Sequence, residues 1–82
     1  MKEITVDDVL ELQNKFAKYC DQAEQHEFPM LLMIQIRLDK TVDMIQKAGV
    51  VEDQKDVRAM FRVVLKTIGE NYEEYVEETL WK

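Results

Sequence analysis

Side chains of the kinds that bind metal ions gather between residues 20 and 27. Cys20, Glu24 and Glu27 share one face of an expected helix, and His26 follows close by in the sequence. His26 projects away from that face, however, and the segment contains neither a Glu-x-x-His pair nor a Cys-x-x-Cys pair. Because the ligands of a metal site must converge before their chemical type matters, we expect no metal and no other cofactor. Cys20 is interpreted as a small buried apolar residue.

The remaining carboxylates could supply paired acids for acid–base catalysis. Four glutamates, at positions 73, 74, 77 and 78, crowd the most polar part of the chain. Burial is what raises a carboxyl pKa into a catalytic range, and nothing in this cluster predicts burial. The sequence shows no Ser-His-Asp or Cys-His motif and no glycine-rich phosphate loop. We therefore predict that the chain is not an enzyme.

DNA binding is a third kind of chemistry to weigh. Residues 45–51, followed by a helix with Arg58 and Arg62, have the outline of a helix-turn-helix motif. The interval between Gly49 and the next core residue is longer than that motif usually leaves, and two aspartates at the start of the second helix would face phosphates. A net charge of −6 also opposes direct contact with nucleic acid. DNA binding is kept as a minor alternative.

Composition limits the fold that must position these residues. The 82 residues suit a single domain, and 46% hydrophobic residues argue against disorder. Two glycines and one proline leave little material for turns, so we predict an all-α fold. The lone cysteine and the lack of a signal peptide favour the cytoplasm. The longest apolar run, residues 30–34, is too short for membrane insertion.

Start and stop signals place two helices in the first part of the chain, at 5–27 and 29–48. Thr5 can cap the first helix with Asp8 three residues later, a variant of the capping box. Pro29 suits the first turn of the second helix, and Gly49 suits its end. One core residue is expected from each helix, and these are Phe16, Ile34 and Phe61.

A third helix is expected over 53–80, with Asp53 as its cap. Gly69 could break it, and Asn71 with Glu74 could cap a separate fourth helix. The apolar stripe stays in phase across Gly69, so we favour one long helix over two. Three helices with short turns predict a three-helix up-down-up bundle.

The second helix carries more apolar surface than such a bundle can cover. Leu32, Met33 and Ile36 lie off its main apolar stripe. Exposed apolar patches on small proteins mark contact surfaces, so we predict a protein-binding site here. The residues expected to bind a partner protein are Leu32, Met33, Ile36, Lys40, Met44, Arg58, Arg62 and Trp81.

The charges of the third helix bear on the partner. Its first half has a basic stripe and its second half an acidic one, formed by Lys55, Arg58, Arg62, Lys66, Glu70, Glu73 and Glu77. An antiparallel copy of the same helix would place opposite charges together, which favours a homodimer. A solvated face with an acidic tail explains the same pattern, and both interpretations stay open.

The sequence thus predicts a small acidic, cytoplasmic, non-enzymatic protein–protein interaction module. It would act as a regulator or inhibitor through the apolar patch and form a homodimer. The alternative is an acidic decoy, in which residues 70–78 imitate nucleic-acid phosphates and occupy a basic groove of a target. Salt separates the two, because a decoy complex would weaken steeply as ionic strength rises.

Overall fold

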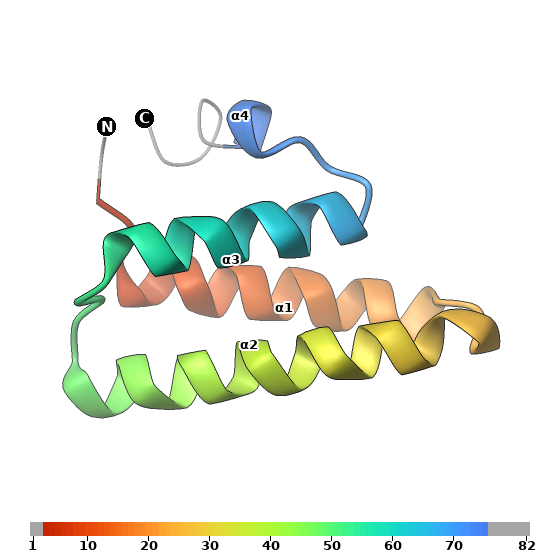
Figure 1. The fold of residues 1–82 in the computed structure, drawn as a ribbon, viewed down its shortest axis with the longest axis horizontal. Coiled ribbons are helices and arrows are strands. Elements are labelled where there is room, and N and C mark those ends of the chain that lie inside the picture. The colour runs from red at the N-terminus through yellow and green to blue at the C-terminus, as the bar shows by residue number, and fades with distance from the viewer. Residues whose placement is uncertain (1–2, 76–82) are drawn as a thin grey trace.

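The computed structural model describes residues 3–75, and all regular secondary structure in that range is helical. The helices are α1 (Val6–Gln22), a 3₁₀ turn η1 (Gln25–Glu27), α2 (Phe28–Ala48), α3 (Gln54–Thr67) and α4 (Tyr72–Tyr75). Figure 1 shows α1, α2 and α3 lying side by side, with α4 on the side of α3 away from α2. The prediction of an all-α fold is confirmed.

Local capping explains why α1 begins where it does. The Asp8 N–H donates to Thr5 Oγ1 at 3.2 Å, and the Thr5 N–H donates to Asp8 Oδ2 at 2.8 Å. These bonds satisfy two of the backbone donors that a helix start leaves without partners. The predicted capping box is therefore present.

The first helix is shorter than the predicted range of 5–27. Ala23 and Glu24 are extended, with ψ of 151° and 153°, so α1 ends at Gln22 and η1 follows. The side chain of Glu27 stabilises this break, because it accepts the Glu24 N–H at 3.0 Å and the Tyr19 hydroxyl at 2.9 Å. Those two bonds fold the connection back toward α1 and start α2 one residue before Pro29.

Both ends of α2 and the start of α3 follow their sequence signals closely. Pro29 lies in the first turn of α2, and Gly49 ends that helix with a positive φ of 75°. The Gly49 N–H donates to the carbonyl of Ile45 at 2.8 Å. Asp53 caps α3 by accepting the Asp56 N–H at 3.1 Å.

The chain breaks at Gly69, contrary to the single helix favoured over 53–80. Gly69 has a φ of 80°, a left-handed conformation that suits glycine, and α3 has already ended at Thr67. The Glu70 N–H returns to the carbonyl of Leu65 at 2.8 Å, and Asn71 then accepts the Glu74 N–H on its side chain. The alternative of a separate fourth helix is therefore the one observed; residues 76–80 lie outside the described range.

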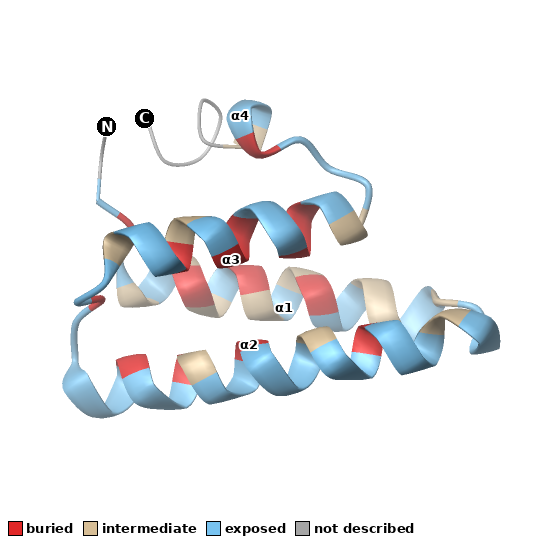
Figure 2. Ribbon diagram, in the orientation of Figure 1, coloured by how far each residue is buried: buried red, intermediate tan, exposed pale blue. Residues whose placement is uncertain are grey.

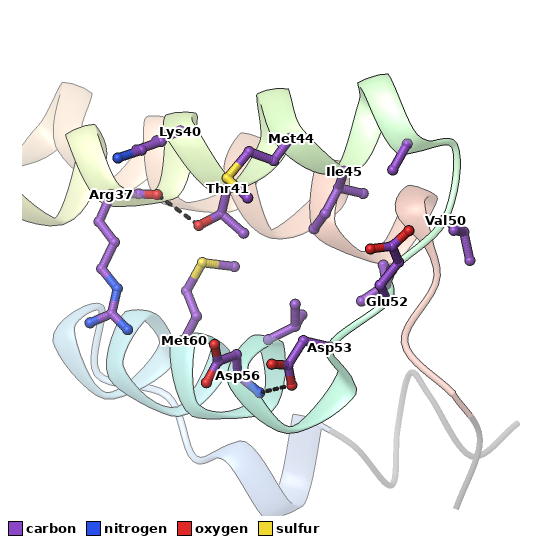
Figure 3. A pocket seen from close by; sticks show the side chains of 13 residues that line it. Arg37, Lys40, Thr41, Met44, Ile45, Val50, Glu52, Asp53, Asp56 and Met60 are labelled. Carbon is purple, nitrogen blue, oxygen red and sulfur yellow. Dashed lines mark hydrogen bonds between the residues drawn. The ribbon is translucent and has the colours of Figure 1, made fainter.

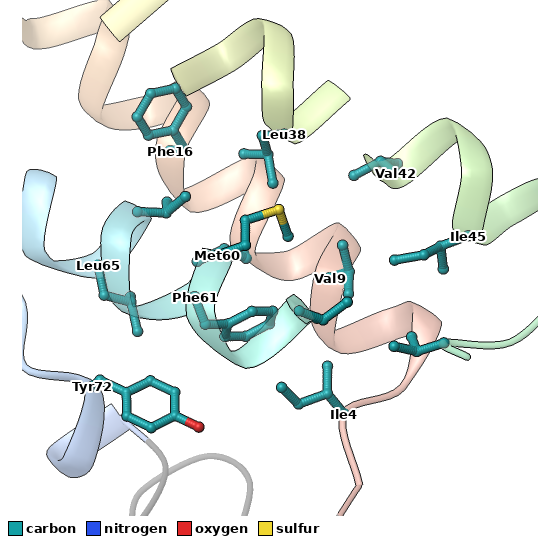
Figure 4. Packing of buried hydrophobic residues seen from close by; sticks show 14 of the residues in the cluster. Ile4, Val9, Phe16, Leu38, Val42, Ile45, Met60, Phe61, Leu65 and Tyr72 are labelled. Carbon is teal, nitrogen blue, oxygen red and sulfur yellow. The ribbon is translucent and has the colours of Figure 1, made fainter. Parts of the chain in front are cut away.

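Buried positions occur on α1, α2, α3 and α4, mostly on the sides that face a neighbouring helix (Figure 2). Phe16 and Phe61 are fully buried, as predicted, whereas Ile34 is only partly buried at the edge of the core. Figure 4 shows Met60 and Phe61 of α3 projecting toward residues of α1 and α2. Gln54 ties the start of the chain to α3, because its amide accepts the Ile4 N–H and donates to the Ile4 carbonyl.

The segment 70–75 covers the groove between α1 and α3. The ring of Tyr75 lies 6.1 Å from the ring of Phe61 of α3 and 5.7 Å from Nζ of Lys15 of α1, measured to ring centroids. Lys15 Nζ also lies 2.9 Å from Glu70 Oε2. The three long helices thus have one groove covered by the chain itself.

Candidate protein-binding groove

A second groove, between α2 and α3, is open in the described part of the chain. It consists of two hollows of about 370 and 170 Å³ that share Arg37 and Met60. In Figure 3 the side chain of Arg37 reaches from α2 toward α3, and that of Met60 rises from α3 between the helices. We call this pair of hollows the α2–α3 groove.

The residues that form the α2 wall of the groove are aligned along one side of the helix. Met33, Arg37, Lys40 and Met44 recur at intervals of four, three and four residues, so they form one stripe along α2. Met33 is 74% exposed and Met44 is 62% exposed, although both are apolar. The stripe therefore presents apolar side chains to solvent at both ends and cations between them.

The α3 wall provides the apolar floor. Met60 and Val57 are buried and line the larger hollow, while Val63, 46% exposed, lines the smaller one. Val50 adds an exposed apolar side chain at the turn before α3. An open hollow with an apolar floor and an apolar rim is typical of a site that binds another molecule.

Charge is distributed unevenly around the larger hollow. Arg37 and Lys40 lie on the α2 wall, whereas Glu52, Asp53 and Asp56 lie at the end where α3 begins (Figure 3). Within residues 3–75, none of these five side chains takes part in an ion pair. Their charges are therefore open to groups on a partner.

The structure separates the residues predicted to bind a partner. Met33, Lys40 and Met44 line the α2–α3 groove. Leu32 and Ile36 are 56% and 60% exposed, but they belong to neither hollow and form a separate apolar patch on α2. The predicted surface is thus two adjoining surfaces.

Arg58 and Arg62 lie away from the groove. Cζ of Arg62 is 4.6 Å from the centroid of the Tyr72 ring, so this guanidinium packs on α4. Nε of Arg58 is buried and has no hydrogen-bond partner among the described residues. Neither arginine lines either hollow, and Trp81, also predicted, lies outside the described residues.

Sequence reasoning missed most of the α3 wall. The residues expected to bind a partner include Arg58 and Arg62 of α3 but neither Met60 nor Val63. A signal was available, because Val63 is an apolar residue outside the main apolar stripe of its helix, as Met33 is in α2. Asp53 and Asp56 are recognised from the sequence as signals for the start of α3, and that role gives no indication that they also lie beside the hollow.

The polar side chains of residues 19–27 form a hydrogen-bonded junction between α1 and α2. Hydrogen bonds from the Glu24 N–H and the Tyr19 hydroxyl hold the pKa of Glu27 below its ordinary value. The bond to Glu27 raises the pKa of Tyr19, and burial raises the pKa of Cys20. His26 is exposed, with Nδ1 3.3 Å from Glu24 Oε2. In residues 3–75 no three potential metal ligands converge, and these side chains join two helices.

No helix within residues 3–75 combines the length and the apolar character needed to cross a bilayer. Comparison of the chain with protein-family models, with curated proteins and with solved structures finds no match. The function must therefore be argued from the geometry of the groove and the patch.

Proposed function

We propose that this chain is a non-enzymatic protein–protein interaction module that acts as a regulator or inhibitor by binding a partner protein through α2. The observation that carries the proposal is the exposed apolar surface of α2, where Leu32, Met33, Ile36 and Met44 are each more than half exposed. A cytoplasmic location and an up-down-up order of the three long helices are parts of the same proposal, the first supported by the single cysteine.

The energetics support a contact role. Burying an exposed apolar side chain of this size contributes about 1.5–3 kcal/mol to binding. Three or four of them therefore offset part of the free-energy cost of association. Burial of the α2 surface therefore favours association with a partner.

We propose that the Leu32–Ile36 patch forms a homodimer. These side chains lie one helical turn apart on α2, and a two-fold axis near them would pair the patch with its own copy. A monomeric chain would instead use this patch to bind a different protein, so the oligomeric state distinguishes the two uses of the patch.

Sedimentation equilibrium from 1 to 200 µM, concentrations of the order that such an interface requires, tests this proposal. We expect the wild type to dimerise and the double variant Leu32→Glu with Ile36→Lys to remain monomeric. The matched control is Gln35→Glu with Gln46→Lys, which introduces the same charges at exposed positions of α2 and should leave the dimer intact.

A monomeric wild type would overturn the homodimer and leave α2 as a surface for a different protein. A double variant that still dimerises would place the interface elsewhere on the chain, which would contradict the proposed role of the patch.

A further inference from the structure

We infer that the α2–α3 groove binds one amphipathic helix of a different protein, with acidic side chains toward Arg37 and Lys40 and basic ones toward Glu52, Asp53 and Asp56. The inference rests on the proposed function and names the kind of partner that the groove takes. It concerns a surface separate from the Leu32–Ile36 patch.

The shape of the groove indicates a helix. Met33 and Met44 are eleven residues apart on α2, so the groove extends about 16 Å, or three helical turns. A helix lying along it could place apolar side chains at i, i+4, i+7 and i+11 into the two hollows, which is a common mode of peptide recognition.

The chain itself covers the α1–α3 side of the bundle with a short helix. The segment 70–75 lies between α1 and α3, and its α4 helix presents Tyr72 and Tyr75, three residues apart, to the core. Between α2 and α3 the described chain supplies no such helix, and the hollows stay open (Figures 1 and 3).

Charge specifies the chemistry of the occupant. Arg37 and Lys40 stand near the middle of the groove and the three carboxylates stand at one end, and no described ion pair neutralises any of them. Covering these groups without opposite charges would remove their hydration without compensation. A partner therefore needs acid at its centre and base at the end that meets Asp53 and Asp56.

A second copy of this chain is the less suitable occupant. The chain carries a net charge of −6, which would oppose the approach of another copy to the acidic end of the groove. A basic residue on a different protein gains attraction at the same place, and this would speed association as well as select the partner.

Two designed helical peptides of identical composition test the inference on the full chain. Both have leucine at i, i+4, i+7 and i+11. In the first, glutamates flank the two central leucines and lysines flank the two outer ones; in the second, every glutamate and lysine is exchanged. Because lysines stand at both ends of the first peptide, it can meet the carboxylates in either orientation.

Fluorescence anisotropy of labelled peptides gives the affinities, and amide NMR shifts of the full chain locate the contact. We expect the first peptide to bind about tenfold or more tightly than the second, with shifts along Met44, Met60 and Val63. Met44→Glu should weaken its binding at least tenfold, whereas Gln46→Glu, an exposed position outside both hollows, should not.

Equal affinities, shifts centred on Leu32 and Ile36, or no binding of either peptide at 1 mM would each overturn the inference. Shifts at groove residues when the protein alone is concentrated would identify a second copy as the occupant and would also overturn it. None of these results changes the sedimentation behaviour of the Leu32 and Ile36 variant, so the two proposals fail separately.

Discussion

The ring of Tyr75 packs against the ring of Phe61 with their centroids 6.1 Å apart and their planes inclined by 59°. This tilted geometry is one that aromatic pairs prefer, and it fastens the four-residue α4 to α3. Lys15 joins the same cluster from α1. The contact explains why the α1–α3 side of the bundle is covered, whereas the α2–α3 groove is open among the described residues.

Phe61 is expected to be the most costly residue of α3 to truncate. It is fully buried between Tyr75 and the α1–α2 core, so Phe61→Ala should lower the free energy of unfolding by about 3–5 kcal/mol. Urea denaturation followed by circular dichroism measures the loss. Val63→Ala, on the exposed side of the same helix, is the control and should cost less than about 1 kcal/mol. An unchanged midpoint for Phe61→Ala would contradict the packing described here.

Gly69 is expected to resist replacement by alanine. A Cβ at this position would meet no atom within 4 Å, so any cost comes from the positive φ of 80° and not from a neighbour. Gly69→Ala should destabilise the fold by about 1–2 kcal/mol, and Gly69→Asn by less, because asparagine adopts this conformation more readily. Thermal melts of both variants test the prediction. A neutral or stabilising alanine would indicate a helix that continues through Gly69.

Local signals in the sequence were sufficient where neighbouring residues determine the backbone. Thr5 with Asp8, Pro29, Gly49 and Asp53 all lie at helix ends as predicted, since each acts through bonds or dihedral angles within its own turn. The apolar stripe of the predicted third helix was less informative about whether that helix continues through Gly69. A stripe identifies which residues face the core, whereas the backbone between them can still turn.

The remaining features depend on contacts that spacing does not contain. The break at Ala23 follows from the bonds of Glu27 with Glu24 and Tyr19, and a helix from 5 to 27 would have placed these groups differently. The groove depends on which pair of helices the last segment covers. Met33 and Met44 could be recognised as surplus apolar residues, but their partner Met60 on α3 could not.

The helix junction at Glu27 should make stability depend on pH. The bonds from the Glu24 N–H and the Tyr19 hydroxyl lower the pKa of Glu27 in the folded state, so the unfolded state binds its proton first as the pH falls. The associated stability is present above the ordinary glutamate pKa of about 4.3 and is lost as the pH falls through the lower folded value.

Glu27→Gln should therefore destabilise the protein at pH 7, and its effect should shrink as the pH falls below the ordinary glutamate pKa of about 4.3. Urea midpoints at several pH values measure the gap between variant and wild type. Glu52→Gln removes an exposed carboxylate that makes no side-chain hydrogen bond among the described residues, and it serves as the matched control. A gap for Glu27→Gln that stays constant with pH would contradict the proposed linkage.

Met60 links the stability of the core to the openness of the groove. It is only 4% exposed, yet it lines both hollows, so its removal would widen an open groove and leave no sealed void. Leu65 is fully buried on the same helix and lines neither hollow, so its truncation would leave an enclosed cavity. Because the cost of truncation rises with the volume of the cavity left behind, Met60→Ala should cost about 2 kcal/mol and Leu65→Ala about 3–5 kcal/mol.

Urea denaturation of the two variants under one set of conditions measures the difference. Equal losses would mean that the α2–α3 groove is closed over Met60 in solution, which would also remove the space required for a partner helix.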